Sequence, residues 1–207
     1  TRYRDREASV QAVSDALAAL ARAKVGNYLA FFPSYAYLRQ VHEDFTARYP
    51  DIGTLAQESG LDARPGRPFW NSSAQAPQKH CWASGSMGGI FGEGVDLVGD
   101  RLIGCAIVGV GLPQVNPRQE ILRRYYDEAG GTGFDYAYRF PGMNKVLQAA
   151  GRVIRTQEDR GVVLLLDDRF ARAEYTRLFP RHWHQLQYLR STTELEQQLA
   201  AFWALNQ

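Results

Sequence analysis

Apolar and polar positions along the chain follow two periodicities, one typical of helices and one of buried strands. Apolar side chains recur at helical spacing over residues 7–22 and again after Ser34, a residue type that caps helices. Short apolar runs bounded by turn-forming residues predict strands at 27–32, 52–57, 80–84, 102–110 and 162–166.

The second half of the chain carries clearer helix signals. Asn116 is a capping residue and Pro117 suits the first position of a helix. Helices are predicted at about 117–128, 144–155 and 193–205. Residues 59–79 are rich in Pro, Gly, Ser, Asn and Gln, which predicts a loop with at most one short helix.

Strands that alternate with amphipathic helices predict an α/β fold, a parallel sheet flanked by helices on both faces. In such sheets the loops that bind ligands follow the carboxyl ends of the strands. Here those loops are predicted to begin at Pro33, Gly85, Gly111 and Asp167. We therefore expect the residues with chemical roles to gather near this edge of the sheet.

Composition narrows the class of protein. The 207 residues, 45% of them hydrophobic, fit one domain. No apolar run approaches the ~18 residues of a membrane span, and the charged segment 1–7 is unlike a signal peptide. Because the chain begins without Met, we interpret it as a piece of a longer protein.

Charge and cysteine content add little direct evidence of function. The net charge of +2 is compatible with nucleic acid but does not argue for it. Cys81 and Cys105 are the only cysteines, too few for a disulfide framework or a zinc or iron–sulfur site. We expect a reducing, cytoplasmic setting and no metal site in this chain.

The most informative stretch is Gln148-Ala-Ala-Gly-Arg-Val-Ile-Arg155. On one continuous α-helix, Arg152 would lie about 40° and Arg155 about −20° around the axis from Gln148. Two guanidinium groups and an amide would then project from one side, a donor set suited to phosphate oxygens. The alternative is an ordinary solvated polar face.

A glycine-rich stretch at 88–96 is a second candidate ligand loop. Its acidic residues Glu93 and Asp96 make it a poor phosphate cradle, and a flexible turn is the alternative. The sequence contains no Gly-Lys pair, so the lysine loop with which NTPases hold phosphate is missing. If the chain works on ATP, something else must hold most of the nucleotide.

Taken together, these segments resemble motifs of the DinG/XPD family of superfamily-two DNA helicases. Residues 148–155 resemble the sixth helicase motif, and the stretch 159–169 is similar to the segment that comes after this motif in the family. Residues 89–97 resemble the fifth motif and 31–35 the fourth. The order and spacing agree, and the similarity spans about residues 25–170.

The resemblance implies a RecA-like fold of the P-loop NTPase type, with residues 1–207 forming the second motor domain. In the family, ATP lies between two such domains. The first carries the phosphate loop, the Mg²⁺ carboxylates and the iron–sulfur cluster, none of which we expect in this chain. Its partners would be single-stranded DNA and the first RecA-like domain, and the isolated piece would be inactive.

Site residues follow from the resemblance by position. It implies catalytic roles for Gln148, Arg152 and Arg155, nucleotide contacts for Glu93, Gly94 and Asp96, and DNA contacts for Ser34, Tyr35, Ser84 and Gly85. Arg155 and Arg152 would be arginine fingers that stabilise charge on the γ-phosphate. Asp168 and Arg169 are predicted to brace the arginine helix.

Some features leave alternatives open. The excursion at about 112–141 is longer than a simple connection and pairs arginines with tyrosines, which either bind single strands or pack on the domain. A rival interpretation of the whole chain is a non-catalytic nucleic-acid or protein-binding module that retains the helicase fold. A small-molecule enzyme built on the glycine-rich loop is a third, for which no nucleophile–base pair is present.

Overall fold

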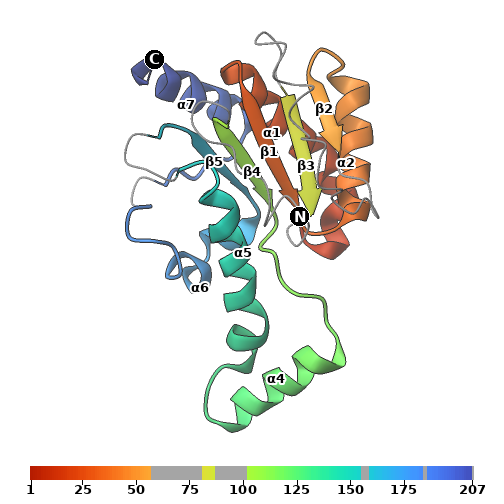
Figure 1. Ribbon diagram of the computed structural model, residues 1–207, viewed down its shortest axis with the longest axis vertical. Coiled ribbons are helices and arrows are strands. Elements are labelled where there is room, and N and C mark those ends of the chain that lie inside the picture. The colour runs from red at the N-terminus through yellow and green to blue at the C-terminus, as the bar shows by residue number, and fades with distance from the viewer. Residues whose placement is uncertain (57–80, 87–101, 155–158, 184–185, 207) are drawn as a thin grey trace, which may run out of the picture.

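The computed structural model describes residues 1–56, 81–86, 102–154, 159–183 and 186–206. Its centre is a sheet of five parallel strands, as the sequence predicts. They are β1 (Asn27–Phe32), β2 (Gly53–Ala56), β3 (Cys81–Ser86), β4 (Gly104–Val108) and β5 (Val162–Leu166), in the order β2-β3-β1-β4-β5. All carboxyl ends therefore meet at one edge, close to the N-terminus of the chain (Figure 1).

The helical segments follow the predicted order. They are η1 (Tyr3–Asp5), α1 (Arg6–Ala23), α2 (Tyr35–Arg48), α4 (Pro117–Glu128), η2 (Asp135–Arg139), α5 (Phe140–Ala150), η3 (Asp168–Ala171), α6 (Ala173–Thr176) and α7 (Thr192–Leu205). Asn116 caps α4 by accepting a hydrogen bond from the Gln119 N–H, as its residue type predicts. The predicted loop at 59–79 lies outside the described residues.

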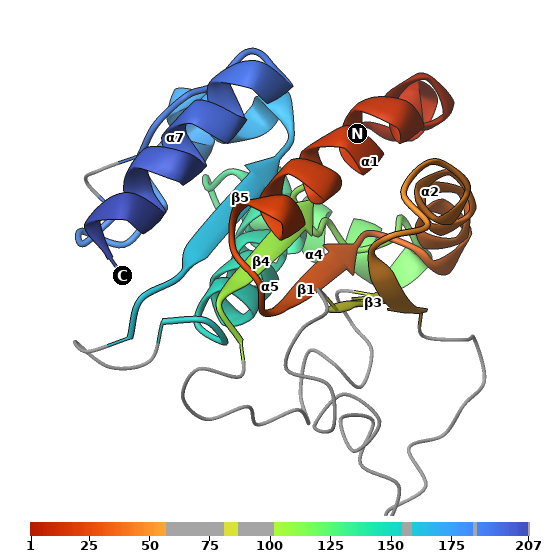
Figure 2. The ribbon, with the colours of Figure 1, turned by 90° about the horizontal axis from the view of Figure 1, so that it is seen from above.

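Helices cover both faces of the sheet, which confirms the predicted α/β layering. Helices α1, α2 and α7 lie on one face, and α5 crosses the other (Figure 2). Strand β1 illustrates this layering. Tyr28 and Phe32 belong to the first core, beneath α1, α2 and α7, whereas Leu29 and Phe31 belong to the second core, beneath α5. Successive strand residues face opposite sides, so a wholly apolar run suits a strand buried on both.

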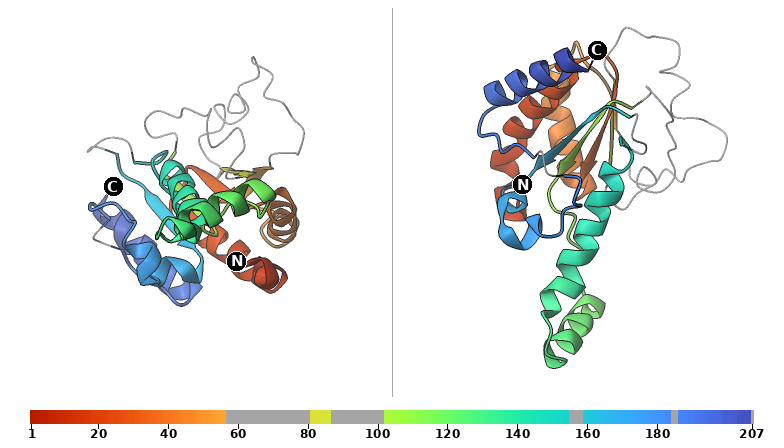
Figure 3. Two further views of the ribbon diagram at one scale, coloured as in Figure 1. Left: turned by 90° about the horizontal axis from the view of Figure 1, so that it is seen from below. Right: turned by 90° about the vertical axis from the view of Figure 1, so that its left-hand side faces the viewer.

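The excursion between β4 and α5 forms a helical arm that projects beyond the carboxyl edge of the sheet (Figures 1 and 3). Helix α4 forms its outer part, and the π-helical segment η2 leads back into α5. Pro141 near the start of α5 has no N–H to donate to the preceding turn. The sequence predicts a helix at 144–155, but α5 begins at Phe140 and ends at Ala150, so both predicted ends are wrong.

Candidate functional site

Gln148 and Arg152 lie at the end of α5, but not on one continuous helix as predicted. Gln148 is exposed on the last turn of α5, and Gly151 is the C-cap residue. Beyond it the chain tightens, since the N–H groups of Arg152 and Val153 donate three residues back, to Ala149 and Ala150. Arg152 is half-buried in this turn.

The side chain of Val153 explains why the helix stops there. Val153 is 5% exposed and belongs to the second core. It packs so closely on Gly161 that a Cβ there would overlap Val153 Cγ1 and lie 2.9 Å from the Ile103 carbonyl oxygen. Glycine has a poor helix propensity, so Gly151 offers little resistance to this change of direction.

The turn at 151–153, which contains Arg152 and is called the arginine turn, lies at the amino edge of the sheet. At the start of α5, a Cβ on Gly142 would meet the Val110 carbonyl oxygen at 2.6 Å, beyond the carboxyl end of β4. At its other end, Val153 packs on Gly161, which precedes β5 and lies next to the carbonyl oxygen of Ile103, the residue before β4. Helix α5 thus runs antiparallel to β4, and the prediction that all chemically promising residues gather at the carboxyl edge is wrong for Gln148 and Arg152.

The carboxyl edge carries the other set of predicted residues. Ser34 caps α2, and its Oγ accepts hydrogen bonds from the Tyr37 N–H at 3.3 Å and from Arg6 Nη1 at 3.2 Å. Tyr35 follows as the first residue of the helix and is half-buried. Ser34 and Tyr35 therefore stand where β1 ends.

Ser84 and Gly85 lie within strand β3, not in a turn after it as predicted. Their parallel partners in β1 are Ala30 and Phe31. Their backbones are therefore next to β1, two residues or fewer from the carboxyl edge. Arg155, Glu93, Gly94 and Asp96 lie outside the described residues, so their predicted roles stay predictions.

A buried carboxylate closes the carboxyl edge beside β5. The side chain of Asp167 accepts hydrogen bonds from Arg169 Nε at 2.7 Å and Nη2 at 2.8 Å, and from the Thr1 hydroxyl. Burial alone would disfavour the charged form, but these hydrogen bonds outweigh that cost and lower the pKa of Asp167 to about 2. The carboxylate therefore fastens the start of the chain to the end of β5.

Asp168 and Arg169 do not brace the arginine turn, which corrects that prediction. Asp168 pairs with Arg2 at 2.6 Å and with Arg172 at 3.0 Å, both at the carboxyl edge. Arg169 pairs with its neighbour Asp167. Both residues make their ion pairs near the N-terminus, at the edge of the sheet opposite to Arg152.

The tyrosines of the arm mostly contact other residues of the arm. Tyr136 stacks on Tyr126 with ring centroids 4.1 Å apart, and the Tyr138 hydroxyl donates to Glu120 at 2.6 Å. Tyr125 remains 63% exposed. These contacts support the alternative that the tyrosines pack within the protein. Binding of single-stranded nucleic acid stays a prediction for the exposed rings.

Asp135 at the base of the arm was not singled out by sequence reasoning. Its carboxylate is 4% exposed and accepts hydrogen bonds from Arg139 and, at 3.0 Å, from Arg177 Nη2. These contacts join η2 to the segment that follows α6. An acidic residue at the start of a tyrosine-containing helical segment carries no sequence signal that would have identified this anchor.

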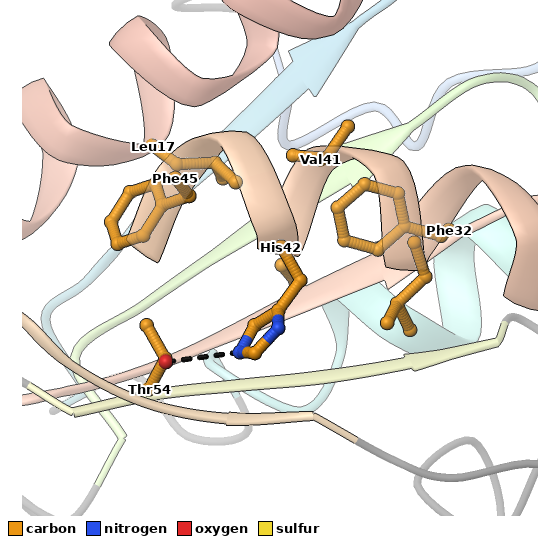
Figure 4. Close-up of a pocket in the computed structure, with 8 residues that line it drawn as sticks. Leu17, Phe32, Val41, His42, Phe45 and Thr54 are labelled. Atoms are coloured by element: carbon orange, nitrogen blue, oxygen red, sulfur yellow. Dashed lines mark hydrogen bonds between the residues drawn. The ribbon is translucent and has the colours of Figure 1, made fainter. Parts of the chain in front are cut away.

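A small pocket lies between α2 and the sheet (Figure 4). Its lining is apolar apart from His42 and Thr54, whose Nε2 and Oγ1 atoms lie 3.0 Å apart. Burial lowers the pKa of His42, which favours the neutral ring. The two polar side chains of this pocket thus contact each other. Most of the glycine-rich loop on which the small-molecule enzyme alternative rests lies outside the described residues, so that alternative stays a prediction.

The described part of the chain offers neither a metal cluster nor a membrane span. Within it, no three His, Cys, Asp or Glu side chains are grouped so that they could hold a metal ion. None of the helices seen there is long and apolar enough to cross a membrane.

Comparison with known sequences finds a helicase family and two helicases similar to this chain. The family described as the helicase C-terminal domain matches residues 17–186. Human regulator of telomere elongation helicase 1 is 29% identical over 187 residues, 81% of this chain and 15% of that protein. The ATP-dependent DNA helicase DinG of Photobacterium profundum is 36% identical over 89 residues, 42% of this chain and 13% of that protein. The chain thus spans only a small part of these relatives.

Solved structures share the fold. A structure of apo XPD matches with a TM-score of 0.64 at 21% identity, over 79% of this chain and 33% of that one. Xpd4 of S. tokodaii matches with a TM-score of 0.62 at 16% identity, over 85% of this chain and 33% of that one. At such identities the likeness concerns the arrangement of the sheet and its helices.

Proposed function

Because the chain belongs to the helicase C-terminal domain family of DinG/XPD-type, ATP-dependent DNA helicases, we propose that its two edges serve two ligands. The amino edge of this second motor domain completes an ATP site, and the carboxyl edge forms part of the track for single-stranded DNA. The proposal takes residues 1–207 as one RecA-like domain from which the α4–α5 arm projects.

The observation that carries the proposal is the position of Gln148 and Arg152 together at the amino edge of the sheet. Gln148 is exposed and Arg152 is half-buried on successive turns, with Val153 anchored in the core beneath them. A backbone fixed in this way can hold a guanidinium group in place for charge that develops on a phosphate. We propose that Arg152 and Arg155 act as arginine fingers and that Gln148 contacts the phosphate or the attacking water.

This donor set cannot bind and activate ATP alone. It has no lysine loop, and the residues around it offer amide and guanidinium donors but no described carboxylate cluster for Mg²⁺. We assign the Mg²⁺ ligands, the phosphate loop and any iron–sulfur cluster to the first RecA-like domain. Mg²⁺, when bound there, would neutralise charge on the phosphates. Glu93, Gly94 and Asp96 would approach the nucleotide from this domain.

Two separate edges suggest how hydrolysis is coupled to movement. ATP would draw the two motor domains together because it gains contacts with Gln148, Arg152 and Arg155 only in the closed state. Closure would move Ser34, Tyr35 and the β3 segment with Ser84 and Gly85 relative to DNA contacts on the first domain. Alternating closed and open states would then advance the strand.

A comparison of the isolated chain with the full-length protein tests whether the ATP site is shared between the two motor domains. The chain alone should hydrolyse ATP no faster than a buffer control, because most of the site is missing. The full-length protein should hydrolyse ATP and be stimulated by single-stranded DNA. Hydrolysis by the pure chain would mean that it holds a complete site. A full-length protein with no hydrolysis would favour the non-catalytic binding module.

Replacement of Gly161 by alanine should impair hydrolysis from a distance. The new methyl group would overlap Val153 and the Ile103 carbonyl oxygen, so the turn that carries Arg152 must shift. Because misplacement by about 1 Å can cost roughly 100-fold in rate, we expect at least a tenfold lower kcat in the full-length protein. The affinity for single-stranded DNA, measured by fluorescence anisotropy, should not change. An unaltered kcat would show that the geometry of this turn is not important.

A further inference from the structure

Arg6, the first residue of α1, is held in an unusual setting at the carboxyl edge. Its guanidinium carbon lies 5.1 Å from the ring centroid of Tyr3 and 5.4 Å from that of Tyr37. Its Nη1 donates a hydrogen bond to Ser34 Oγ at 3.2 Å. Two aromatic rings and a hydroxyl therefore fix the orientation of this cation.

The charge of Arg6 has no negative partner among the residues that the structure describes. Neighbouring arginines do have one: Arg2 pairs with Asp168, and Arg169 with Asp167. Arg6 Nε is buried and makes no hydrogen bond to the part of the chain that the structure describes, and burial lowers the pKa of the side chain. A cation withdrawn from water without a carboxylate is costly to the fold, which is a reason to look for an anion that completes it.

The surroundings fit a nucleotide better than an isolated ion. Tyr3 is 85% exposed, so its outer face is open to a flat, apolar partner such as a base. Ser34, which Arg6 contacts, is one of the residues already proposed to face DNA. Two N–H groups in the first turn of α2, those of Tyr35 and Ala36, have no acceptor within the helix and add positive character.

We propose that Arg6 binds a backbone phosphate of single-stranded DNA, with Ser34 as second donor and Tyr3 stacking on the adjacent base. This inference rests on the proposed function, since it adds residues of η1 and α1 to the DNA track. The Tyr37 ring lies against the guanidinium, so Tyr37 is a positioning residue. Its own hydroxyl is engaged with Ser9 Oγ at 2.7 Å.

The test uses the full-length helicase and a fluorescent oligothymidylate, titrated at several salt concentrations. Arg6→Gln should weaken binding about tenfold or more, because a charge-assisted hydrogen bond is lost. The slope of log Kd against log salt should also fall by about 0.7, the value for one phosphate contact on a single strand. A merely structural role would not change that slope.

Arg22→Gln is the matched control. Arg22 lies on the same helix and over an aromatic ring, Tyr49, but it is paired with Asp51. It should leave both affinity and slope unchanged. Arg6→Lys keeps the charge and should restore the slope, and Tyr3→Phe should bind as wild type while Tyr3→Ala binds more weakly. These variants keep the test valid if Arg6→Gln folds poorly.

The outcomes separate this inference from the proposed function. Unchanged affinity and slope in Arg6→Gln, with strong binding by the wild type, would overturn the inference alone. A raised KM for ATP with unaltered DNA affinity would also overturn it, by assigning the guanidinium to the nucleotide. A wild-type protein without affinity for single-stranded DNA would overturn the inference together with the proposed DNA track.

Discussion

Replacement of Arg155 by alanine in the full-length helicase is expected to lower DNA-stimulated ATP hydrolysis by about 1000-fold or more, the effect of losing an arginine finger. The expectation follows from the resemblance of residues 148–155 to the sixth helicase motif and from the position of Arg152, three residues earlier, at the amino edge. The affinity for single-stranded DNA should stay within about twofold, because the proposed DNA contacts lie at the opposite edge.

Steady-state hydrolysis at saturating DNA and ATP measures this effect, and anisotropy measures DNA affinity on the same preparation. Arg22→Ala is the control, since it removes an arginine from the far face of the sheet, where it pairs with Asp51. Wild-type turnover in Arg155→Ala would contradict the finger role. An equal loss of DNA affinity would contradict the separation of the two edges.

The second large effect is expected on stability. Asp167→Ala should reduce the free energy of unfolding by about 3 kcal/mol or more, because it leaves Arg169 without its carboxylate in a largely buried setting. The side chains of Asp167 and Arg169 are 0% and 18% exposed. The substitution also removes one of the two acceptors of the Thr1 hydroxyl and the cap of η3. Urea-induced unfolding measures the change.

Asp168→Ala is the matched comparison for Asp167→Ala. Asp168 is 55% exposed, and solvent screens its pairs with Arg2 and Arg172, so its removal should change stability very little. The dependence of the free energy of unfolding on pH is a second measurement. The folded-state pKa of Asp167 is lowered to about 2, so its contribution is complete above the ordinary pKa of aspartate and is lost as the pH falls through about 2. Equal effects of the two substitutions would contradict this account.

Local signals in the sequence predicted most of the fold. The apolar run Asn27–Phe32 became β1 with the predicted ends, since a strand buried on both faces needs no polar alternation. Ser34 and Asn116 became N-caps, because their side chains satisfy N–H groups within three residues of themselves. Such features depend on neighbours in the chain, which sequence patterns report well.

The site was harder to predict because it depends on distant contacts. Helical periodicity predicted a helix through to Arg155, whereas α5 ends at Ala150 and Val153 then packs on Gly161. The general rule for carboxyl-edge ligands did not account for a helix that returns antiparallel to β4. Arg6 gave no signal either. Its setting beside Tyr3, Tyr37 and Ser34, with no carboxylate partner among the described residues, appears only in the folded chain.

Hydrogen–deuterium exchange on the full-length helicase would locate both ligands in one experiment. With a non-hydrolysable ATP analogue, the amides at 151–155 should become protected, whereas single-stranded DNA alone should protect those at 34–37. Protection of 34–37 by the nucleotide alone, or of 151–155 by DNA alone, would contradict the assignment of phosphate to the amino edge and DNA to the carboxyl edge.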